Sequence, residues 1–410
     1  MAARRSRWRT RGAACSLALA CVTAAGCGGG GALSAESLNL SPTLGASGAP
    51  HDRGAADPAS GTSSAACVSR VYGQMTLDQR VGQLFLVGAP ADVAGADTLA
   101  AVRDYHFGSV LLPDTDAGTA ALAAASASIQ ALAPSATAGA RFLIGANQEG
   151  GEVQQLTGSG FATMPSEVVQ GSWTVSALRA QAQTWGSELR SAGVNLDLAP
   201  VMDVVPTATA DQNAPIGALD REFGSEPAGN GEHGAAFIEG MARAGVASVA
   251  KHFPGLGMVT GNTDDVSNVV DNVTTANSPD LGSFKDAIGA GVPFVMVALA
   301  TYTRIDPSRL AVFSPVVIKL LRSGLGFGGV IVSDDLGDAA AVQSIPASQR
   351  ATEFLDAGGD LITSQSIAPA EEMATAVVAR ASADASFRAV VDSAARKVLA
   401  AKQAQGLLSC

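Results

Sequence analysis

Residues Ser248 to Gly257 read Ser-Val-Ala-Lys-His-Phe-Pro-Gly-Leu-Gly. Their start belongs to a short apolar run, Val246 to Ala250, which is too brief for a helix and β-branched enough for a buried strand. Pro254 and the glycines after it forbid regular structure, so Lys251 and His252 lie where the strand ends. A cation and an imidazole at the carboxyl end of a buried strand are typical of the site of a parallel barrel. A strand end with a solvated lysine and a hydrogen-bonded histidine is the alternative.

The same pattern, a short apolar run followed by Gly, Pro, Asp or Asn, repeats along the chain with Ala-rich stretches between the runs. We expect helices in such stretches, for example over 176–192 and 231–244. Eight β/α units in one domain predict a single (β/α)8 TIM-type barrel over residues 67–410. A doubly wound open sheet is the alternative, but the first run lacks the glycine-rich phosphate-binding turn that such a sheet needs. The eight strand candidates are Leu84 to Val87, Ser109 to Leu112, Phe142 to Ala146, Leu196 to Ala199, Val246 to Ala250, Phe294 to Val297, Val330 to Val332 and Leu361 to Thr363.

Polar residues gather where these predicted strands end. The cluster after the seventh run could be explained without a functional site, because Ser333 or Asp334 could cap the helix that follows. Four clusters on the face where barrels keep their active sites predict a functional site there. The clusters are Asn147-Gln148-Glu149 after the third run, Asp203 and Arg221 after the fourth, Lys251-His252 at the fifth, and Ser333-Asp334-Asp335 at the seventh.

The composition bounds the class of protein. The 410 residues are 47% hydrophobic and 15% charged, which is ample for a large core. The formal net charge of -11 argues against a nucleic-acid partner. No stretch after residue 30 is apolar for eighteen residues or more, so we expect no internal membrane span.

The first 27 residues have the features of an export signal. Five arginines between residues 4 and 11 precede an apolar stretch from Ala13 to Ala25. The segment ends in Ala-Ala-Gly-Cys with four glycines after Cys27, which resembles the cleavage and acylation site of bacterial lipoproteins. Ala24 stands where a leucine is usual, so an ordinary signal peptide cleaved nearby is the alternative. Either predicts an exported protein, and the resemblance implies membrane attachment only through lipid on Cys27.

Residues 28–66 consist mainly of Gly, Ala, Ser, Pro and Thr. Such a segment cannot bury enough surface to fold, so we expect a flexible tether. Two cysteines remain beyond it, Cys67 at the start of the predicted barrel and Cys410 as the last residue. In an oxidising compartment this pair predicts a disulfide that joins the ends of the barrel, and two free thiols are the alternative.

The loops at the strand ends together resemble the family 3 glycoside hydrolases, in the single-domain branch of β-N-acetylhexosaminidases. The branch motif is Lys-His-(Phe/Ile)-Pro-Gly-(His/Leu)-Gly, four free positions, then Asp-(Ser/Thr)-His, and residues 251–257 match its first part fully. The likeness covers about residues 68–405. It extends to Gln148-Glu149-Gly150-Gly151, Asp220-Arg221-Glu222-Phe223-Gly224, Phe313-Ser314-Pro315, Leu320-Leu321-Arg322, and the stretch from Gly324 to Leu336.

The resemblance implies a (β/α)8 barrel that removes terminal β-linked sugars with retention of configuration, and it places Asp334 at the nucleophile position. Physical reasoning agrees, because a carboxylate at a strand tip, fixed by the backbone amides of the following turn, stays ionised and faces the barrel mouth. Asp335 is the adjacent choice, and the alternation of side chains along a strand lets only one of the two face the sugar.

The resemblance also implies sugar-binding residues. Lys251, His252 and Arg221 match positions that hold sugar hydroxyls. Asn147 stands in place of an aspartate that grips the sugar as an acceptor. An amide can bind hydroxyls too, but it changes the donor and acceptor pattern and so leaves the identity of the sugar open.

Retaining hydrolysis needs a second group, which protonates the leaving oxygen and later activates water. In this branch that group is a histidine with an aspartate two residues before it, whereas here the positions read Asn262-Thr263-Asp264. Asp264 or Asp265 is the candidate acid/base, provided that burial raises its pKa. The alternative is a catalytically impaired glycan-binding envelope lipoprotein. Retention of the nucleophile favours the enzyme, and a solute-binding protein for a transporter would need two lobes.

An exported protein of this kind would meet GlcNAc-containing glycans of the cell envelope, such as peptidoglycan fragments or small chito-oligosaccharides. The reaction requires no cofactor and no metal. The acidic residues near Asp264 lack the ligand spacing of an EF-hand loop, which favours a solvated polar loop. The predicted outer helices give no sign of an oligomer, so we expect a monomer.

Overall fold

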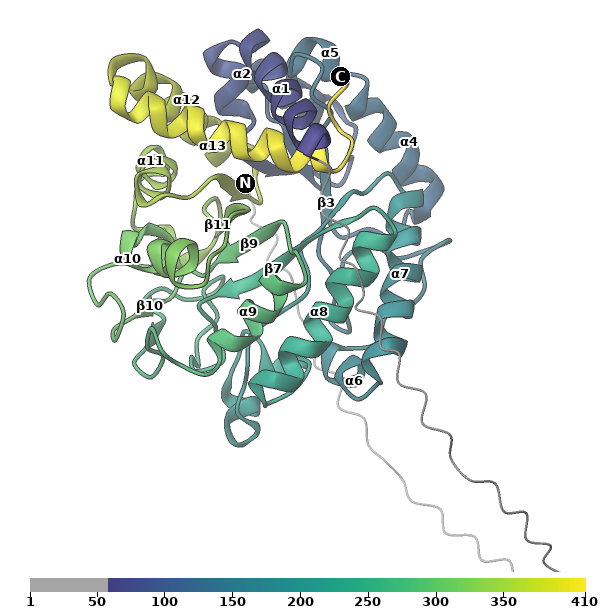
Figure 1. The fold of residues 1–410 in the computed structure, drawn as a ribbon, viewed down its shortest axis with the longest axis vertical. Coiled ribbons are helices and arrows are strands. Elements are labelled where there is room, and N and C mark those ends of the chain that lie inside the picture. The colour runs from purple at the N-terminus through teal and green to yellow at the C-terminus, as the bar shows by residue number, and fades with distance from the viewer. Residues whose placement is uncertain (1–57) are drawn as a thin grey trace, which may run out of the picture. The chain divides into compact units, whose positions relative to one another are not determined.

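The computed structural model describes residues 58–410, and in it eight parallel strands close into a barrel (Figure 1). The order around the barrel is β1-β12-β11-β9-β7-β6-β3-β2, so consecutive barrel strands are neighbours and β12 closes on β1. The predicted (β/α)8 TIM-type barrel is therefore confirmed. Each of the eight apolar runs forms one strand, and these are β1 (Phe85–Gly88), β2 (Ser109–Leu111), β3 (Leu143–Ala146), β6 (Leu196–Asp197), β7 (Ala247–Phe253), β9 (Phe294–Val297), β11 (Val330–Asp335) and β12 (Leu361–Ser364).

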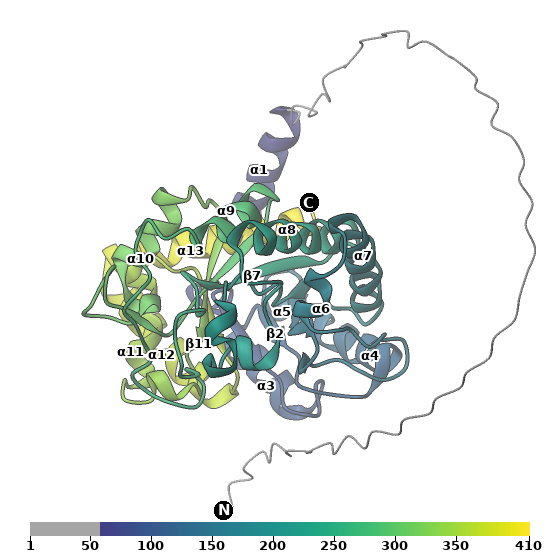
Figure 2. The ribbon, with the colours of Figure 1, turned by 90° about the horizontal axis from the view of Figure 1, so that it is seen from below.

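Helices surround the strands as a ring, which is seen from below in Figure 2. The two helices predicted from Ala-rich stretches are α7 and α8, which pack against each other on the outside of the barrel. The longer outer helices are α3 (Ala96–Tyr105), α4 (Gly118–Gln130), α7 (Val175–Ser191), α8 (Pro227–Arg243), α9 (Leu281–Gly289), α11 (Ala347–Ala357), α12 (Ile367–Ala383) and α13 (Ala385–Ala404).

Capping and turn residues set the limits of the helices. The hydroxyl of Thr174 accepts a hydrogen bond from the amide of Ala177 and so begins α7. Pro227 occupies the first turn of α8, where its missing N–H costs nothing. Both helices are followed by a glycine with positive φ, Gly193 at 82° and Gly245 at 77°, which turns the chain back toward the next strand.

Apolar side chains fill the barrel interior. The carboxyl end of the strands is here called the mouth of the barrel. Because side chains alternate along a strand, a residue two positions after one that points into the interior also points inward, but nearer the mouth. That alternation brings Asn147 to the mouth from β3. The ends of β7 and β11, which carry Lys251 and Asp334, each contain a register irregularity, between Ala250 and Phe253 and between Val332 and Asp335. The interior layer is Leu86, Leu111, Leu143, Leu196, Leu198, Ala247, Val249, Phe294, Met296, Val330, Val332 and Leu361.

The opposite end of the barrel is closed by α13 and the tail after it. Val398 and Leu407 pack into the interior layer. The Nζ of the fully buried Lys402 donates to Oε1 of Gln83 at 2.6 Å and to the carbonyl oxygen of Gly108 at 2.7 Å. Burial disfavours the charged amine and lowers the pKa of Lys402 to about 7. This end is thus a structural plug.

Helix α1 (Pro58–Gln74) packs against α13 and runs outward from the barrel (Figure 2). A disulfide joins Cys67 of α1 to Cys410. The predicted tether of 28–66 is therefore too long at its C-terminal end, because the helix begins at Pro58. The prediction rested only on the small apolar surface that this segment can bury. Once the packed part of a helix has formed, each further residue adds one backbone hydrogen bond, so the helix extends into a segment that buries little surface. The predicted signal peptide and Cys27 lie outside the described residues.

Short elements complete the barrel. They are α2 (Leu77–Gly82), α5 (Ala133–Ala136), α6 (Glu167–Gly171), α10 (Pro315–Lys319), the strand pair β4 (Gln148–Gly150) and β5 (Val153–Gln154), the pair β8 (Val270–Asp271) and β10 (Thr301–Tyr302), and the helical turns η1 (Thr207–Gln212), η2 (Gly217–Leu219), η3 (Ala311–Phe313), η4 (Leu320–Gly324) and η5 (Ala340–Val342). Over residues 58–410, none of the helices combines the length and apolarity needed to cross a membrane.

Candidate active site

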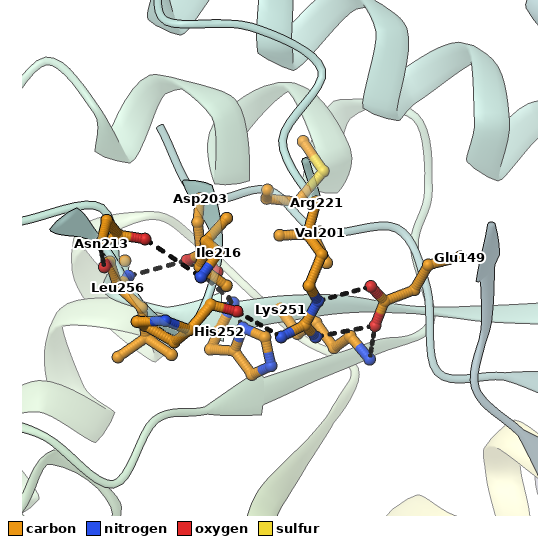
Figure 3. A network of polar contacts seen from close by, with 12 residues as sticks. Glu149, Val201, Asp203, Asn213, Ile216, Arg221, Lys251, His252 and Leu256 are labelled. Carbon is orange, nitrogen blue, oxygen red and sulfur yellow. Dashed lines mark hydrogen bonds and ion pairs between the residues drawn. The ribbon is translucent and has the colours of Figure 1, made fainter. Parts of the chain in front are cut away.

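A buried carboxylate clamps two cations at the mouth (Figure 3). Glu149, in the β4–β5 hairpin after β3, accepts from Nε and Nη2 of Arg221 at 2.8 and 2.9 Å. Its Oε1 also lies 2.6 Å from Nζ of Lys251, at the end of β7. The Nη1 of Arg221 donates in addition to the carbonyl oxygen of Pro215 at 2.7 Å. Three segments far apart in the sequence are thereby fixed to one another.

The clamp is ionised. Burial alone would raise the pKa of Glu149, but the charges of Arg221 and Lys251 outweigh it and lower that pKa to about 2. A buried carboxylate that is paired with two cations and hydrogen-bonded by both is the arrangement in which burial of charge is tolerated. Glu149 therefore holds the two candidate sugar-binding cations in place.

Two further carboxyl groups lie fully buried beside this clamp. Burial, followed by the negative charge of Glu149, raises the pKa of Glu167 well above its ordinary value. Burial likewise raises the pKa of Asp197. Each accepts one backbone amide, Glu167 from Val201 at 3.0 Å and Asp197 from Gln148 at 3.0 Å. Burial therefore favours the neutral form of both carboxyl groups. The clamp itself, one carboxylate with two cations, carries one net positive charge.

His252 is oriented by a second buried carboxylate. The Nδ1 of His252 lies 2.8 Å from Oδ2 of Asp203, and Oδ1 of Asp203 accepts the backbone amides of His252 and Leu256 at 3.1 and 2.9 Å. The carboxylate acceptor makes Nδ1 the protonated nitrogen, which leaves Nε2 as the other functional atom of the ring. The side chain is 8% exposed. Asp203 therefore fixes both the ring and the Pro-Gly loop that follows it.

The two adjacent aspartates at the end of β11 have different environments. Asp334 is half-buried, and its Oδ1 accepts the backbone amide of Asp335 at 2.8 Å. Asp335 is buried and accepts the amides of Gly337, Asp338 and Gln365 at 2.8, 3.0 and 3.0 Å. The sequence predicts that Asp334 takes the backbone amides of the following turn, but in the structure those amides donate to Asp335, and Asp334 accepts only the amide of Asp335 itself. Asp335 has the structural role, whereas Oδ2 of Asp334 accepts no hydrogen bond from the described residues and is left for a substrate.

The loop that carries the candidate acid/base is fixed to the segment after β11. The amide of Ala340 donates to the carbonyl oxygen of Asp264 and that of Ala341 to the carbonyl oxygen of Thr263, both at 3.1 Å. Asn262 shapes the loop, since its Oδ1 accepts the amide of Asp264 and its Nδ2 donates to Oδ2 of Asp265, again both at 3.1 Å. Asp265 is thus engaged within the loop.

Asp264 stands in the electrostatic field of the two strand aspartates. The side chain of Asp264 is exposed. Partial desolvation of its carboxyl by the surrounding protein, and then the charges of Asp334 and Asp335, nevertheless raise its pKa to about 6. His252 and Arg221 act in the opposite direction. Burial also raises the pKa of Asp335 to about 6, against its three backbone hydrogen bonds. Asp264 is therefore a carboxyl group that can exchange a proton near neutral pH.

Asn147 is part of the same cluster. Its Oδ1 accepts from Nζ of Lys251 at 2.8 Å, and its backbone amide donates to Oε1 of Gln155 at 2.9 Å. The structure thus brings Asn147, Arg221, Lys251 and His252 together on one side of the mouth. Among the described residues, no group of three or more His, Cys, Asp or Glu side chains is placed to hold a metal ion.

Sequence reasoning missed four carboxyl groups. Glu149 lay in a quoted motif and Asp203 in a strand-end cluster, but neither received a role. A carboxylate between two cations cannot be recognised until the fold brings β4, β7 and the loop of Arg221 together. Glu167 and Asp197 gave no signal in the sequence, because their importance comes only from burial.

Comparison with known proteins gives the class. Residues 76–401 match the glycosyl hydrolase family 3 N-terminal domain. The chain therefore belongs to glycoside hydrolase family 3, and the resemblance seen in the loops is confirmed. As a β-hexosaminidase-like member of that family, the protein is a glycoside hydrolase.

Individual relatives agree with this assignment. The chain is 33% identical over 282 residues to a β-hexosaminidase of Xanthomonas axonopodis pv. citri, which covers 66% of this chain and 81% of that protein. It is 31% identical over 295 residues to the β-hexosaminidase LpqI of Mycobacterium tuberculosis, covering 69% and 71% of the two chains. Among solved structures, the β-N-acetylhexosaminidase of Beutenbergia cavernae superposes with a TM-score of 0.77 at 45% identity, covering 80% of this chain and 99% of that one.

Proposed function

We propose that the protein is an exo-acting, retaining β-N-acetylhexosaminidase that removes terminal β-linked N-acetylglucosamine from cell-envelope glycans. The observation that carries this proposal is the pair of carboxyl groups at the mouth, Asp334 at the end of β11 and Asp264, whose pKa is raised, on the loop fixed to the segment after β11. Membership of family 3 and the names of the relatives support the substrate class. The polar cluster around Glu149 supplies the donors that hold sugar hydroxyls.

In the first step Asp334 attacks the anomeric carbon, and a bond forms between its carboxylate oxygen and that carbon. The bond to the leaving oxygen breaks as Asp264 transfers its proton to that oxygen. A raised pKa suits this role, because a carboxyl group of ordinary pKa would already have lost its proton at neutral pH.

In the second step water releases the sugar. Once Asp334 is esterified it carries no charge, so one of the influences that raised the pKa of Asp264 disappears. Asp264 is then the stronger acid and stays ionised. It accepts a proton from the water that attacks the anomeric carbon, and as the new carbon–oxygen bond forms, the ester bond between that carbon and Asp334 breaks and Asp334 regains its charge. Configuration is retained because two displacements occur at the same carbon.

The experiment is release of 4-nitrophenol from its β-GlcNAc and β-glucoside derivatives by the wild type, Asp334→Asn and Asp264→Asn. We expect turnover of the GlcNAc derivative by the wild type and a loss of about a hundredfold or more in each variant. The changed positions Asn262 and Asp264 favour one competing function, a catalytically impaired glycan-binding lipoprotein. An inert wild type that binds GlcNAc oligomers in calorimetry would establish that function instead.

We also propose that the protein is exported and held at the membrane by lipid on Cys27, acting as a monomer. The amino-terminal sequence supports this proposal. Detergent phase partitioning of the expressed wild type and of Cys27→Ala tests it, with the wild type expected in the detergent phase and the variant in the aqueous phase. Recovery of both in the aqueous phase would contradict anchoring, and light scattering of the variant gives the oligomeric state.

A further inference from the structure

The loop that follows β11, residues 336–345, makes contact beside both candidate catalytic carboxyl groups, and it is here called the β11 loop. At its start, two backbone amides donate to Asp335 at the tip of the strand. In its middle, the amides of Ala340 and Ala341 donate to carbonyl oxygens of the loop that carries Asp264, both at 3.1 Å. A change in the shape of the β11 loop would therefore be passed on to the loop of Asp264.

Arg350 joins the two ends of the β11 loop. It lies in α11 and is 5% exposed. Its Nη1 donates to the carbonyl oxygens of Leu336 and Gly337 at 2.8 and 2.9 Å, and its Nε donates to that of Ile345 at 2.8 Å. Leu336 and Gly337 begin the loop and Ile345 ends it, so one buried guanidinium fixes the two ends to each other.

Gln343 extends this contact into the middle of the loop. Its Oε1 lies 3.4 Å from Nη2 of Arg350, and since arginine has only donors, the amide oxygen is the atom that faces the guanidinium. The amide nitrogen donates to the carbonyl oxygens of Gly337 and Ala339 at 2.9 and 3.2 Å. Ala339 directly precedes Ala340, the first of the two amides that hold the loop of the candidate acid/base. Hydrogen bonds thus lead from the guanidinium to the residue beside these amides.

Neither the helix nor an ion pair accounts for an arginine at this position. Arg350 is in the first turn of α11, which begins at Ala347, and the positive end of the helix dipole disfavours a cation there. In the described part of the chain, none of the ion pairs includes it. Burial lowers the pKa of Arg350, and the more distant charges of Glu372, Asp335 and Asp338 oppose this. A buried cation held by uncharged oxygens is costly to keep, so we look for its role in the loop that supplies those oxygens.

We infer that Arg350 is a positioning residue for proton transfer: by closing the β11 loop, it keeps the carboxyl of Asp264 where that group can protonate the leaving oxygen. The inference rests on the proposed function and adds to it a residue that touches no reacting atom. Without the guanidinium the ends of the β11 loop can separate, and the amides of Ala340 and Ala341 lose their fixed direction. A small displacement of a general acid is enough to slow the step that it assists. Attack by Asp334 should suffer less, because that residue belongs to β11 itself, which pairs with β9 and β12.

The test compares two substrates that differ in their need for an acid. The leaving oxygen of phenyl β-GlcNAc must be protonated, whereas 2,4-dinitrophenolate departs from its β-GlcNAc derivative without a proton from the enzyme. The variants are Arg350→Gln and Arg350→Lys, which keeps the charge but has one nitrogen in place of the fork that reaches both ends of the loop. Arg380→Lys is the matched control, because Arg380 lies on the neighbouring α12 and forms a half-exposed ion pair with Asp356 of α11.

We expect kcat/KM for the phenyl substrate to fall by about thirtyfold or more in both Arg350 variants, and that for the dinitrophenyl substrate to fall by less than about threefold. The ratio of the two values cancels any loss of folded protein, so a variant that is only less stable keeps the ratio of the wild type. The control should keep that ratio within about twofold. Gln343→Ala changes an exposed residue and removes the donor to Ala339, so it should fold and lower the ratio by about threefold or more.

Equal losses on the two substrates, or an unchanged ratio in folded Arg350 variants, would overturn the inference. If the Arg350 variants do not fold, Gln343→Ala decides alone, and an unchanged ratio there has the same meaning. Asp264→Asn is measured beside them, and a lowered ratio in that variant alone removes the role of Arg350 while the proposed function stands. An unchanged ratio in Asp264→Asn, or an inert wild type, refutes both.

Discussion

The carbonyl oxygen of Asp264 accepts a hydrogen bond from the amide of Ala340, 3.1 Å away, across the mouth between the loop after β7 and the segment after β11. The segment after β11 directly follows the strand that carries Asp334. Backbone hydrogen bonds therefore tie the loop that carries one candidate catalytic carboxyl group to the segment that follows the other.

Removal of the Asp264 carboxyl should lower kcat/KM by about a hundredfold to a thousandfold, because proton transfer to the leaving oxygen is lost. Asp265→Asn is the matched control, since that residue is engaged by Asn262, and it should stay within about threefold of the wild type. Sodium azide added to Asp264→Ala should restore turnover and yield a β-glycosyl azide, which proton NMR identifies. An α-configured azide, or equal losses in the two aspartate variants, would contradict this role.

The pH dependence should follow the proton of Asp264. The acid must be protonated in the first step and its pKa is about 6, so kcat/KM should fall as the pH rises through about 6. The charge of Asp334 contributes to raising that pKa, so in Asp334→Asn the carboxyl of Asp264 should titrate at lower pH, as measured by carbon-13 NMR. A titration that shifts upward or not at all in that variant would show that the two groups are not coupled.

Glu149→Gln should lower the free energy of unfolding by about 3–5 kcal/mol, because Arg221 and Lys251 would be left buried without a counter-charge. Glu152→Gln, an exposed position two residues beyond the hairpin strand, is the control and should change it by less than about 0.5 kcal/mol. Urea unfolding measures both. A small effect at Glu149 would mean that the two cations find water or other acceptors.

Lys402 should make stability depend on pH in the alkaline range. Its folded-state pKa of about 7 lies below the ordinary value of 10.5, so between these values the unfolded chain binds more protons than the folded one. The free energy of unfolding should therefore rise with pH from about 7 to 10, by at most about 1.4 kcal/mol per pH unit for one proton. Compared by urea unfolding, Lys402→Met should lack this rise and the surface variant Lys319→Met should keep it. A parallel pH profile for Lys402→Met would contradict the buried neutral amine.

Replacing Cys67 and Cys410 by serine should lower the free energy of unfolding by about 2–5 kcal/mol, because the unfolded chain gains the freedom of an open loop. The disulfide lies at the plugged end of the barrel, so kcat/KM of the folded variant should remain within about twofold. If kcat/KM fell strongly while the variant remained fully folded, the structure of the plugged end would be coupled to that of the mouth.

The barrel could be predicted from the sequence because its signal is local and repeated. Each short apolar run ends in a turn residue, and eight such runs in one domain leave few alternatives. The start of α1 at Pro58 could not be predicted, because the composition of that segment says nothing about the packed helix that it extends. The end plug was also invisible, since α13 reads like any other outer helix until Val398 and Leu407 are seen inside the barrel.

The candidate site was only partly predictable. Asp334, Lys251, His252, Arg221, Asn147 and Asp264 were named from motifs, but the groups that position them were not. The choice between Asp334 and Asp335 illustrates the reason. Both stand at the strand tip, and only the three-dimensional turn shows that Asp335 takes the backbone amides. Similarly, the amide of Asn147 becomes informative only when Lys251 fixes its orientation.

The bond between Cys67 and Cys410 also makes the described barrel a covalent ring. If a protease cuts one exposed loop anywhere between these residues, the two pieces remain a single molecule, with new ends at the cut and the old ends still joined. Barrels tolerate such rearranged chain order when the break falls in an exposed loop, because few contacts are lost there. The molecule could therefore keep its mouth assembled after a nick that would separate an open chain into two fragments.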